Sequence, residues 1–515
     1  MPADAIQFNN IPGSGLVAPI FTAEFNSGGQ YTTVDRFVII GTRGGGALMP
    51  VDTPVRISSQ QEADSYAGMN SVLREMARFA LRNAPALPIY LMATTTGSLT
   101  ARVMTITITA PAVGVGYFEI QGERIQINVS STDTVTTVAR AIQAAVNNYY
   151  NPLTGAQLPV TATAAVGVVT LTSTYPGVLG NEIDVYAPKK ADNVFNSAGV
   201  FTFAQTTPGD GVPTGLANTL AALGDNPADF VISPWSDSTS ISTYAAWSND
   251  VSGRWAWSRQ SYGHVWAPAL DNYSGLTTLG LTLNDRHLSL MGCVTPGAHG
   301  SPTPSYLWNA AAAARLFPRL TDVSTGNIAR AHDGLELIDV KPPRDPSLWP
   351  NYNARNGLAS SGISTWRVAA DGTVLLSKVI TTYQTGPSGN PDSVFRDIQS
   401  VYQCSEGMKF MRAELGVLFG QKALVHSNPG QLSAAVTPAD IKAGFVGIYQ
   451  ELCANLVFQD ADTFAKLIQV RINPNNPNRV DVFCPMERVN PFDILAINAT
   501  IYQQYPSIAL LPIAA

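Results

Sequence analysis

The segment from Phe464 to Pro485 constrains the fold most, because it has the pattern of a β-hairpin whose outer edges are left unpaired. Alternate residues are apolar along 464–472, apart from Lys466, and again along 479–484, and a loop of Asn and Pro separates the two runs. Neither run contains the Pro or Gly that would block further pairing, and an isolated two-stranded hairpin is marginally stable in water. We therefore predict that strands from elsewhere complete this sheet. The predicted acceptor positions are Phe464, Lys466, Ile468, Val470, Ile472, Val480, Val482 and Cys484.

The composition favours a multi-domain protein whose surface is polar but poorly charged. A length of 515 residues predicts about two to four domains. Charged residues make up 13% of the chain, against roughly 25% in a typical soluble domain. Ser, Thr, Asn and Gln supply the remaining polarity, which suits a particle surface or a surface covered by neighbouring molecules. The net charge of -6 shows no basic bias, and this argues against nucleic-acid binding.

The lack of a targeting signal and the spacing of the cysteines predict a protein made in the cytoplasm. The first ten residues lack the basic and apolar regions of a secretory signal. No apolar run approaches the roughly 20 residues of a membrane-spanning helix, so we expect no membrane insertion. The four cysteines lie far apart without metal-binding spacing, and we expect them to be buried free thiols. They are Cys293, Cys404, Cys453 and Cys484.

The order of strands and helices predicts an α/β domain interrupted by a β-rich one. Residues 1–26 contain three prolines and no helical period, so we predict an extended arm with an edge strand at 16–25. A strand at 37–40, a helix at 60–83 and a strand from Pro88 form a β-α-β pattern. The pattern resumes after residue 205, so 27–99 and 206–345 form one α/β domain with a mainly parallel sheet. Residues 100–205, rich in Thr and Val, form an inserted β-rich domain with one helix at 134–148.

The last third of the chain predicts an α+β domain over residues 346–494, followed by an arm at 495–515. Its elements are a hairpin around Asp371-Gly372, a long helix at 392–419, a second helix from Thr437 and the unfinished hairpin. The apolar stripe of the second helix can cover one face of that hairpin. It cannot form hydrogen bonds with the backbone N–H and C=O groups along the hairpin's outer edges. Residues 494–502 offer one more strand.

No sequence pattern supports catalysis, a cofactor or a metal ion. The glycine-rich segment at 37–46 lacks GxGxxG spacing, and no nucleophile elbow, P-loop or HExxH motif occurs. We expect the scattered histidines to be structural or surface residues, and the carboxylate pairs to lie on solvated strand faces. These residues are His264, His287, His299, His332 and His426, with Glu119/Glu123 and Glu182/Asp184. An α/β enzyme with an appended glycan-binding β domain remains an alternative, because a site assembled from distant residues would leave no motif.

The order of parts resembles a contractile tail sheath protein of phages with Mu-like tails. The segments that carry this resemblance are IQFNNIP at 6–12, PIYLMAT at 88–94, the inserted segment 117–185, NARNGLASSGI at 353–363 and the terminal stretch 479–501. The similarity covers nearly the whole chain. No single segment is diagnostic, and the conjunction of the segments in this order is what is specific.

The resemblance implies a mechanical role in a phage tail. Sheath subunits stack as hexameric rings around a tail tube and contract when the baseplate triggers them, so the implied partners are other copies, the tube, the baseplate and the tail terminator. In this family, arms from two neighbours complete the small sheet of the inner domain. The donated residues would be Leu16, Val17, Ile20, Phe21 and Phe25 from the N-terminal arm, and Leu495, Ile497, Ala499 and Ile501 from the C-terminal arm. A baseplate component, or the sheath of a secretion or bacteriocin machine, is the closest alternative.

Overall fold

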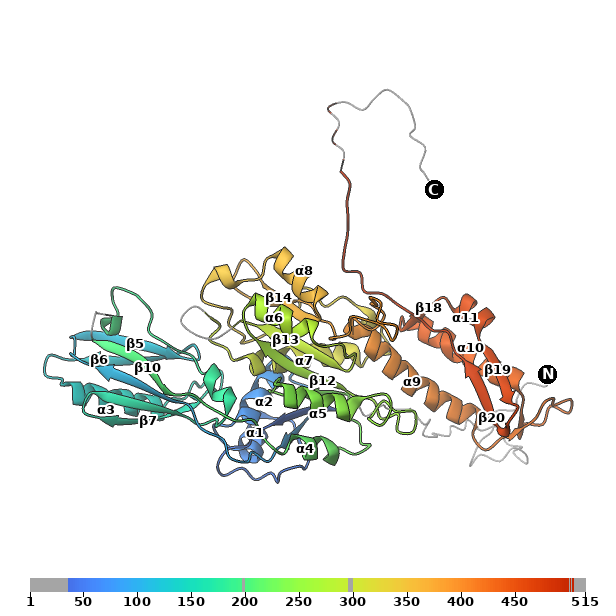
Figure 1. Cartoon of the computed structure of the whole chain (residues 1–515), viewed down its shortest axis with the longest axis horizontal. Helices are drawn as coiled ribbons and strands as arrows, with labels where there is room; N and C mark the ends of the chain where they lie inside the picture. The colour runs from blue at the N-terminus through green and yellow to red at the C-terminus, as the bar shows by residue number, and fades with distance from the viewer. Residues whose placement is uncertain (1–35, 197–199, 295–299, 500, 502, 504–515) are drawn as a thin grey trace, which may run out of the picture.

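An eight-stranded mixed sheet forms the centre of the molecule (Figure 1). The structure is a computed structural model that describes residues 36–196, 200–294, 300–499, 501 and 503, so the predicted N-terminal arm and His299 lie outside the described residues. The strand order is β15-β14-β13-β12-β11-β1-β3-β2. The strands are β1 (Phe37–Gly41), β2 (Val55–Ile57), β3 (Ile89–Ala93), β11 (Phe230–Ile232), β12 (His264–Leu270), β13 (Leu288–Cys293), β14 (Ile363–Val368) and β15 (Val374–Lys378).

Parallel pairing dominates this sheet, as predicted for the α/β part. Every pair from β3 to β14 is parallel, and only the edge strands β2 and β15 run antiparallel to their neighbours. Strands β1, β11 and β13 are buried at every residue, which is the pattern of strands covered on both faces. The prediction placed the β14–β15 hairpin in a separate C-terminal domain, whereas β14 pairs with β13 and extends the large sheet.

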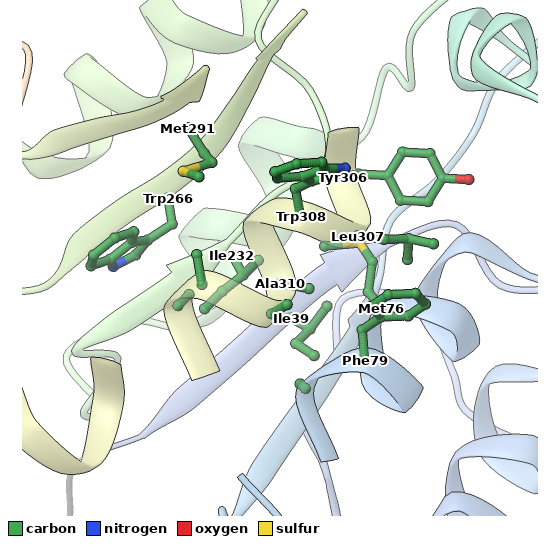
Figure 2. Close-up of a cluster of buried hydrophobic side chains, with 14 of the residues drawn as sticks. Ile39, Met76, Phe79, Ile232, Trp266, Met291, Tyr306, Leu307, Trp308 and Ala310 are labelled. Atoms are coloured by element: carbon green, nitrogen blue, oxygen red, sulfur yellow. The ribbon is translucent and has the colours of Figure 1, made fainter. Parts of the chain in front are cut away.

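Seven helices of the described chain accompany the large sheet, and two of them make its principal packing layer. They are α1 (Gln60–Ala67), α2 (Val72–Asn83), α4 (Leu216–Ala222), α5 (Ser238–Ser248), α6 (Tyr273–Leu281), α7 (Ser305–Leu320) and α8 (Tyr352–Ser360). Figure 2 shows Met76 and Phe79 of α2 beside Trp308 and Ala310 of α7, over Ile39 of β1. The five consecutive alanines of α7 are all buried, because their small side chains let the helix approach its neighbours closely.

The predicted helix at 60–83 is two helices. Gly68 and Asn70 adopt φ values of 79° and 56°, a left-handed region that ends a helix. Ser71 then starts α2 by accepting a hydrogen bond from the amide of Arg74. The sequence contains these breaking residues, but the apolar stripe continues past them and concealed the break.

The β-rich region between β3 and α4 builds two antiparallel sheets of its own. One has the order β10-β4-β8-β7 and the other β6-β5-β9, and neither joins the large sheet. The elements are β4 (Val103–Ile108), β5 (Gly114–Ile120), β6 (Glu123–Val129), α3 (Val135–Asn147), β7 (Val160–Ala165), β8 (Val168–Ser173), β9 (Val185–Tyr186) and β10 (Phe201–Thr207). This region lies at one end of the molecule and the C-terminal helices lie at the other (Figure 1).

The carboxylates expected on solvated strand faces instead connect the β-rich region to the large sheet. Glu182 is buried and accepts hydrogen bonds from the backbone amide and hydroxyl of Ser305, at the start of α7, at 2.6 and 2.9 Å. Burial raises the pKa of Glu182 to about 7, although the bonds from Ser305 lower it. Arg344 contacts the buried Asp184 at 2.6 Å and the half-buried Glu119 at 3.2 Å. The prediction of solvated carboxylates was therefore wrong, because Glu182 faces the start of α7 while Asp184 and Glu119 face Arg344.

The C-terminal region consists of helices with very short sheets. Its elements are α9 (Ile398–Phe419), β16 (Ala423–Leu424), β17 (Ala435–Val436), α10 (Pro438–Ala454), β18 (Phe458–Gln459), α11 (Ala461–Leu467), β19 (Gln469–Asn473), β20 (Asn476–Phe483) and β21 (Glu487–Arg488). Helix α9 begins at Ile398 rather than at the predicted residue 392, because the backbone at Arg396 and Asp397 pairs with Ile380 and Thr381 instead.

Candidate self-assembly interface

Strands β19 and β20 form the hairpin that the sequence predicted. Val470 pairs with Val482 and Ile472 with Val480 on one face, while Arg471 pairs with Asp481 on the other. The two strands make a sheet of their own, and no other strand in the described parts of the chain pairs with either. Within the described residues, the outer backbone edges of the hairpin therefore have no strand partner.

The start of the predicted acceptor run is helical. Phe464 and Lys466 lie in α11, and Ile468 is the residue that ends that helix. Asp460 caps α11 by accepting a hydrogen bond from the amide of Thr463. Phe464 and Ile468 are spaced four residues apart and both are buried, a spacing that suits one helix face as well as it suits alternation in a strand. The first strand of the hairpin accordingly begins at Gln469.

Helix α10 packs against the hairpin. The helix follows Thr437, as the sequence predicted, and Thr437 and Asp440 form a capping box at its start. The ring of Tyr449 stacks on Phe464 with centroids 3.7 Å apart. Its hydroxyl donates to the carbonyl of Gln459 and accepts from the amide of Glu487, both at 2.9 Å. Tyr449 thus joins α10 to α11 and to the β18–β21 ladder.

The two faces of the hairpin differ in burial. Val470, Val482 and Cys484 are half-buried against the core beside α10, and burial raises the pKa of the Cys484 thiol to about 11. On the opposite face Phe483 is 60% exposed, and Asp481 contacts Arg479 at 2.7 Å. No residue of β19 or β20 is fully buried. A further covering of this small sheet would bury apolar area that the single chain leaves in water.

A cluster of charged side chains anchors the segment that precedes the C-terminal arm, up to Asp493. Lys378 of β15 contacts Asp397 at 2.7 Å and also contacts Asp493. Arg488 lies 3.4 Å from Asp397, and the side-chain amide of Gln403 donates to the carbonyl of Val489 at 2.9 Å. Burial would raise the pKa of Asp397, but Lys378 and Arg488 hold it below its usual value. The cluster therefore fixes the chain up to Asp493.

Beyond Asp493 the chain extends away from the body without regular structure in residues 494–499 (Figure 1). Leu495 is 70% exposed, Ile497 76% and Ile501 94%, and Ala499 is also exposed. Apolar side chains that alternate in sequence and face water are unusual in a finished fold. The predicted strand at 494–502 is thus unpaired in this chain at its described residues, and residues 500 and 502 lie outside them.

Histidines and cysteines form no competing site in the described residues. His264, His287 and His332 are buried and His426 is exposed, and no described group of His, Cys, Asp and Glu could hold a metal ion. The four cysteines are free, as predicted, but only Cys293 is fully buried. Among the described helices, none is long and apolar enough to cross a membrane.

Comparison with known proteins finds a relative that spans almost the whole chain. No protein-family model matches the chain. A curated relative, the Mu-like prophage FluMu tail sheath protein of Haemophilus influenzae, is 27% identical over 503 residues, which span 96% of this chain and 98% of the relative. The chain is therefore similar to a tail sheath protein of the Mu-like type along almost its whole length. This confirms the resemblance seen in the sequence. It also makes the chain a structural, non-enzymatic component of a phage tail.

Solved structures similar to this sheath protein have low sequence identity. Sheath tail proteins of Desulfitobacterium hafniense and Listeria innocua are 12% and 11% identical, with TM-scores of 0.47 and 0.44. They cover 92% and 89% of this chain, and 97% and 93% of their own chains are matched. The contracted helical sheath of the anti-feeding prophage is 12% identical, with a TM-score of 0.45, over 95% of this chain and 99% of its own. The similarity to the sequence relative, by contrast, spans both chains almost completely.

Proposed function

We propose that the chain is the polymerising subunit of a contractile tail sheath. In this proposal, copies stack as hexameric rings in a helical assembly around a tail tube, and contraction of the stack drives the tube through the host envelope. The similarity over almost the full length of a tail sheath protein carries the proposal. Two structural features support it: a hairpin with open edges and an exposed apolar arm within one chain.

Strand addition is the proposed means of joining subunits. The segment 495–501 of one copy and the segment 16–25 of another would pair with β19 and β20 of a third. Main-chain hydrogen bonds supply strength in such additions, and alternate side-chain contacts fix the register. Each donated strand would form about four to six hydrogen bonds at a net of about 1 kcal/mol each, with further gain from burying residues such as Leu495 and Ile497.

The same arrangement would let the assembly grow as a helix instead of closing as a small oligomer. The donor arm and the acceptor hairpin are different surfaces, so the contact is heterologous and continues into a helix rather than ending as a dimer. Because the charge cluster fixes the chain through Asp493, we place the start of the arm's freedom at residue 494. Contraction would then move rigid subunit bodies while the paired strands remain joined. The β-rich region, at the end opposite the hairpin, would face outward (Figure 1).

Deletion of residues 495–515 tests the arm directly. We expect soluble subunits that keep the wild-type unfolding temperature and no longer sediment as tubes, because the deleted residues follow the anchored Asp493. Electron microscopy of the purified protein should show tubes or ring stacks for the wild type only. Tubes of normal length from the truncated protein would overturn the arm model.

A matched pair of substitutions tests whether assembly depends on the apolar side chains of the arm, in addition to the arm being present. Ile497→Asp places a charge among the alternating apolar positions and should abolish tubes. Asn498→Asp places the same charge on the neighbouring position, which points to the other face of a strand, and should weaken assembly much less. Equal defects in both variants would argue against strand pairing in the predicted register.

A further inference from the structure

Trp257 is more exposed than any other aromatic side chain in the described part of the chain. Its exposed fraction is 83%, whereas every other tryptophan is buried or half-buried. It lies in the loop that runs from Asn249, at the end of α5, to Gly263, just before β12. Tryptophan is enriched among the residues that dominate binding energy at protein interfaces. Its position in the loop therefore raises the question of what it contacts.

Buried side chains on both sides of Trp257 hold this loop in one conformation. Arg254 is 0% exposed, and Arg259 donates to the carboxylate of Asp225 at 2.8 Å. Because the loop is already ordered, presenting Trp257 to a partner costs little further conformational entropy. The guanidinium of Arg254 donates, over distances of 2.5 to 3.0 Å, to the backbone carbonyls of Gly224, Asn226, Ser261 and Tyr262.

A cavity of about 310 Å³ lies where the short helix η1 (Val178–Glu182) of the β-rich region meets the ends of β11 and β12. It is open to solvent, and Val178 in its wall is 37% exposed. The bonds from Ser305 to Glu182 fix this wall to α7. An engineered cavity of about 150 Å³ binds benzene, so this one has room for an indole ring. Its apolar lining residues are Val178, Leu179, Trp235, Pro268 and Leu270.

The tryptophan and the cavity lie at opposite ends of the same helix and of the same strand. Asp237, in the cavity wall, caps the start of α5, and Asn249 ends that helix. The 11 residues of α5 span about 16 Å. Leu270, also in the cavity wall, ends β12, whereas the loop of Trp257 leads into the first residue of that strand. Trp257 therefore cannot enter the cavity of its own copy.

We propose that Trp257 of one copy inserts into this cavity of the next copy, as a contact between subunits that is separate from the arms. This step rests on the proposed function, which brings copies of the chain together. An apolar projection that fits a cavity elsewhere on the same molecule makes a heterologous contact, and such a contact repeats along an open polymer. The occupant is a copy because one chain carries both the ordered aromatic side chain and a matching apolar cavity that it cannot fill itself.

Substitutions on the two sides of the contact test the pairing. Trp257→Ala should leave the unfolding temperature unchanged but raise the critical concentration for tube assembly at least about tenfold. Val178→Trp narrows the cavity and should have a similar effect, whereas Val178→Ala should not. The double variant Trp257→Ala/Val178→Trp should be no worse than the poorer single variant, because both changes remove one contact. Leu153→Ala, at a side chain that is 86% exposed, is the control for Trp257→Ala.

Two results of these assays would overturn the proposal. One is assembly of Trp257→Ala at the wild-type critical concentration. The other is a double variant whose defect equals the sum of the two single defects in free energy, because independent contacts add.

Photo-crosslinking identifies what Trp257 contacts. Benzoylphenylalanine at position 257 should crosslink in tubes to residues 178–182, 234–237 or 268–270, and a mixture of isotope-labelled and unlabelled chains should show that the crosslink joins two copies. Crosslinks confined to other segments, or none in tubes, would overturn the proposal. If the wild type formed no tubes, the proposed function would fail, and the same crosslinks in concentrated subunits would decide this contact.

Indole is a probe for the cavity in the single subunit, where assembly plays no part. It should bind the wild type saturably in ligand-observed NMR. Val178→Ala leaves the cavity open and should bind indole within about threefold of the wild type, whereas Val178→Trp should bind it at least about tenfold more weakly. Equal binding by these two variants, with both folded by circular dichroism, would refute the cavity as the acceptor.

Discussion

The large sheet and the small hairpin of this chain differ in burial and in whether neighbouring strands cover their edges. Strand β1 is buried at every residue, between neighbours β3 and β11. No residue of β19 or β20 is fully buried, and the hairpin has no neighbouring strand within the described chain. The described chain completes the large sheet, whereas we propose that neighbouring copies complete the hairpin. The difference indicates which surface stabilises the subunit and which serves the assembly.

The largest effect is expected in the finished sheet. Trp308 is 1% exposed, packs on Trp366 with ring centroids 4.8 Å apart, and donates its indole N–H to the carbonyl of Thr303 at 3.1 Å. Trp308→Ala should lower the free energy of unfolding by about 3–5 kcal/mol, as measured by scanning calorimetry. Val417→Ala, at a side chain that is 79% exposed, is the control. A loss below about 1 kcal/mol for Trp308→Ala would contradict the assignment of this core.

A pH dependence of similar size is expected where the β-rich region meets α7. The folded pKa of Glu182 is about 7, above its ordinary value of 4.5, so the folded state holds a proton that the unfolded state releases. The stabilisation is complete below pH 4.5 and is lost as the pH rises to 7, at about 1.4 kcal/mol per pKa unit. Glu182→Gln should flatten unfolding temperatures across this window, and Glu62→Gln should not. An unchanged slope in Glu182→Gln would show that this carboxyl ionises normally.

An intermediate effect is expected beneath the hairpin. Tyr449→Phe keeps the ring stacked on Phe464 but removes the hydroxyl contacts to Gln459 and Glu487. The expected loss is about 1–2 kcal/mol for the buried hydrogen bonds, seen as faster hydrogen exchange at the amide of Glu487. Tyr352→Phe, at a ring that is 68% exposed, should change nothing. Unaltered exchange at Glu487 would mean that the ring alone holds this junction.

The smallest effect on the subunit is expected on the open face of the hairpin. Phe483 is 60% exposed, so Phe483→Ser should change the free energy of unfolding by less than about 0.5 kcal/mol. The same variant should shorten or abolish tubes in sedimentation, if a donated strand covers this face. Wild-type assembly by Phe483→Ser would limit the interface to the backbone edges and the opposite face.

Local periodicity in the sequence predicted much of the fold. The β-α-β order, the inserted run of Thr- and Val-rich strands and the pairing of β19 with β20 all follow from patterns within a few residues. The start of α10 after Thr437 was predicted for the same reason. Where a pattern fitted two structures, prediction failed: the spacing of Phe464 and Ile468 suits a strand or a helix, and packing on Tyr449 decided for the helix.

The sequence by itself determined which segments are strands and helices and that one hairpin lacks neighbours, because hydrophobic periodicity and turn residues act locally. Only the tertiary structure decided which polar groups are buried and which edges stay open. Asp397 meets Lys378 and Arg488, and Asn147 closes the edge of β7. These contacts join residues distant in the chain, and their energies depend on burial and distance. Neither burial nor distance can be inferred from the local pattern of residues.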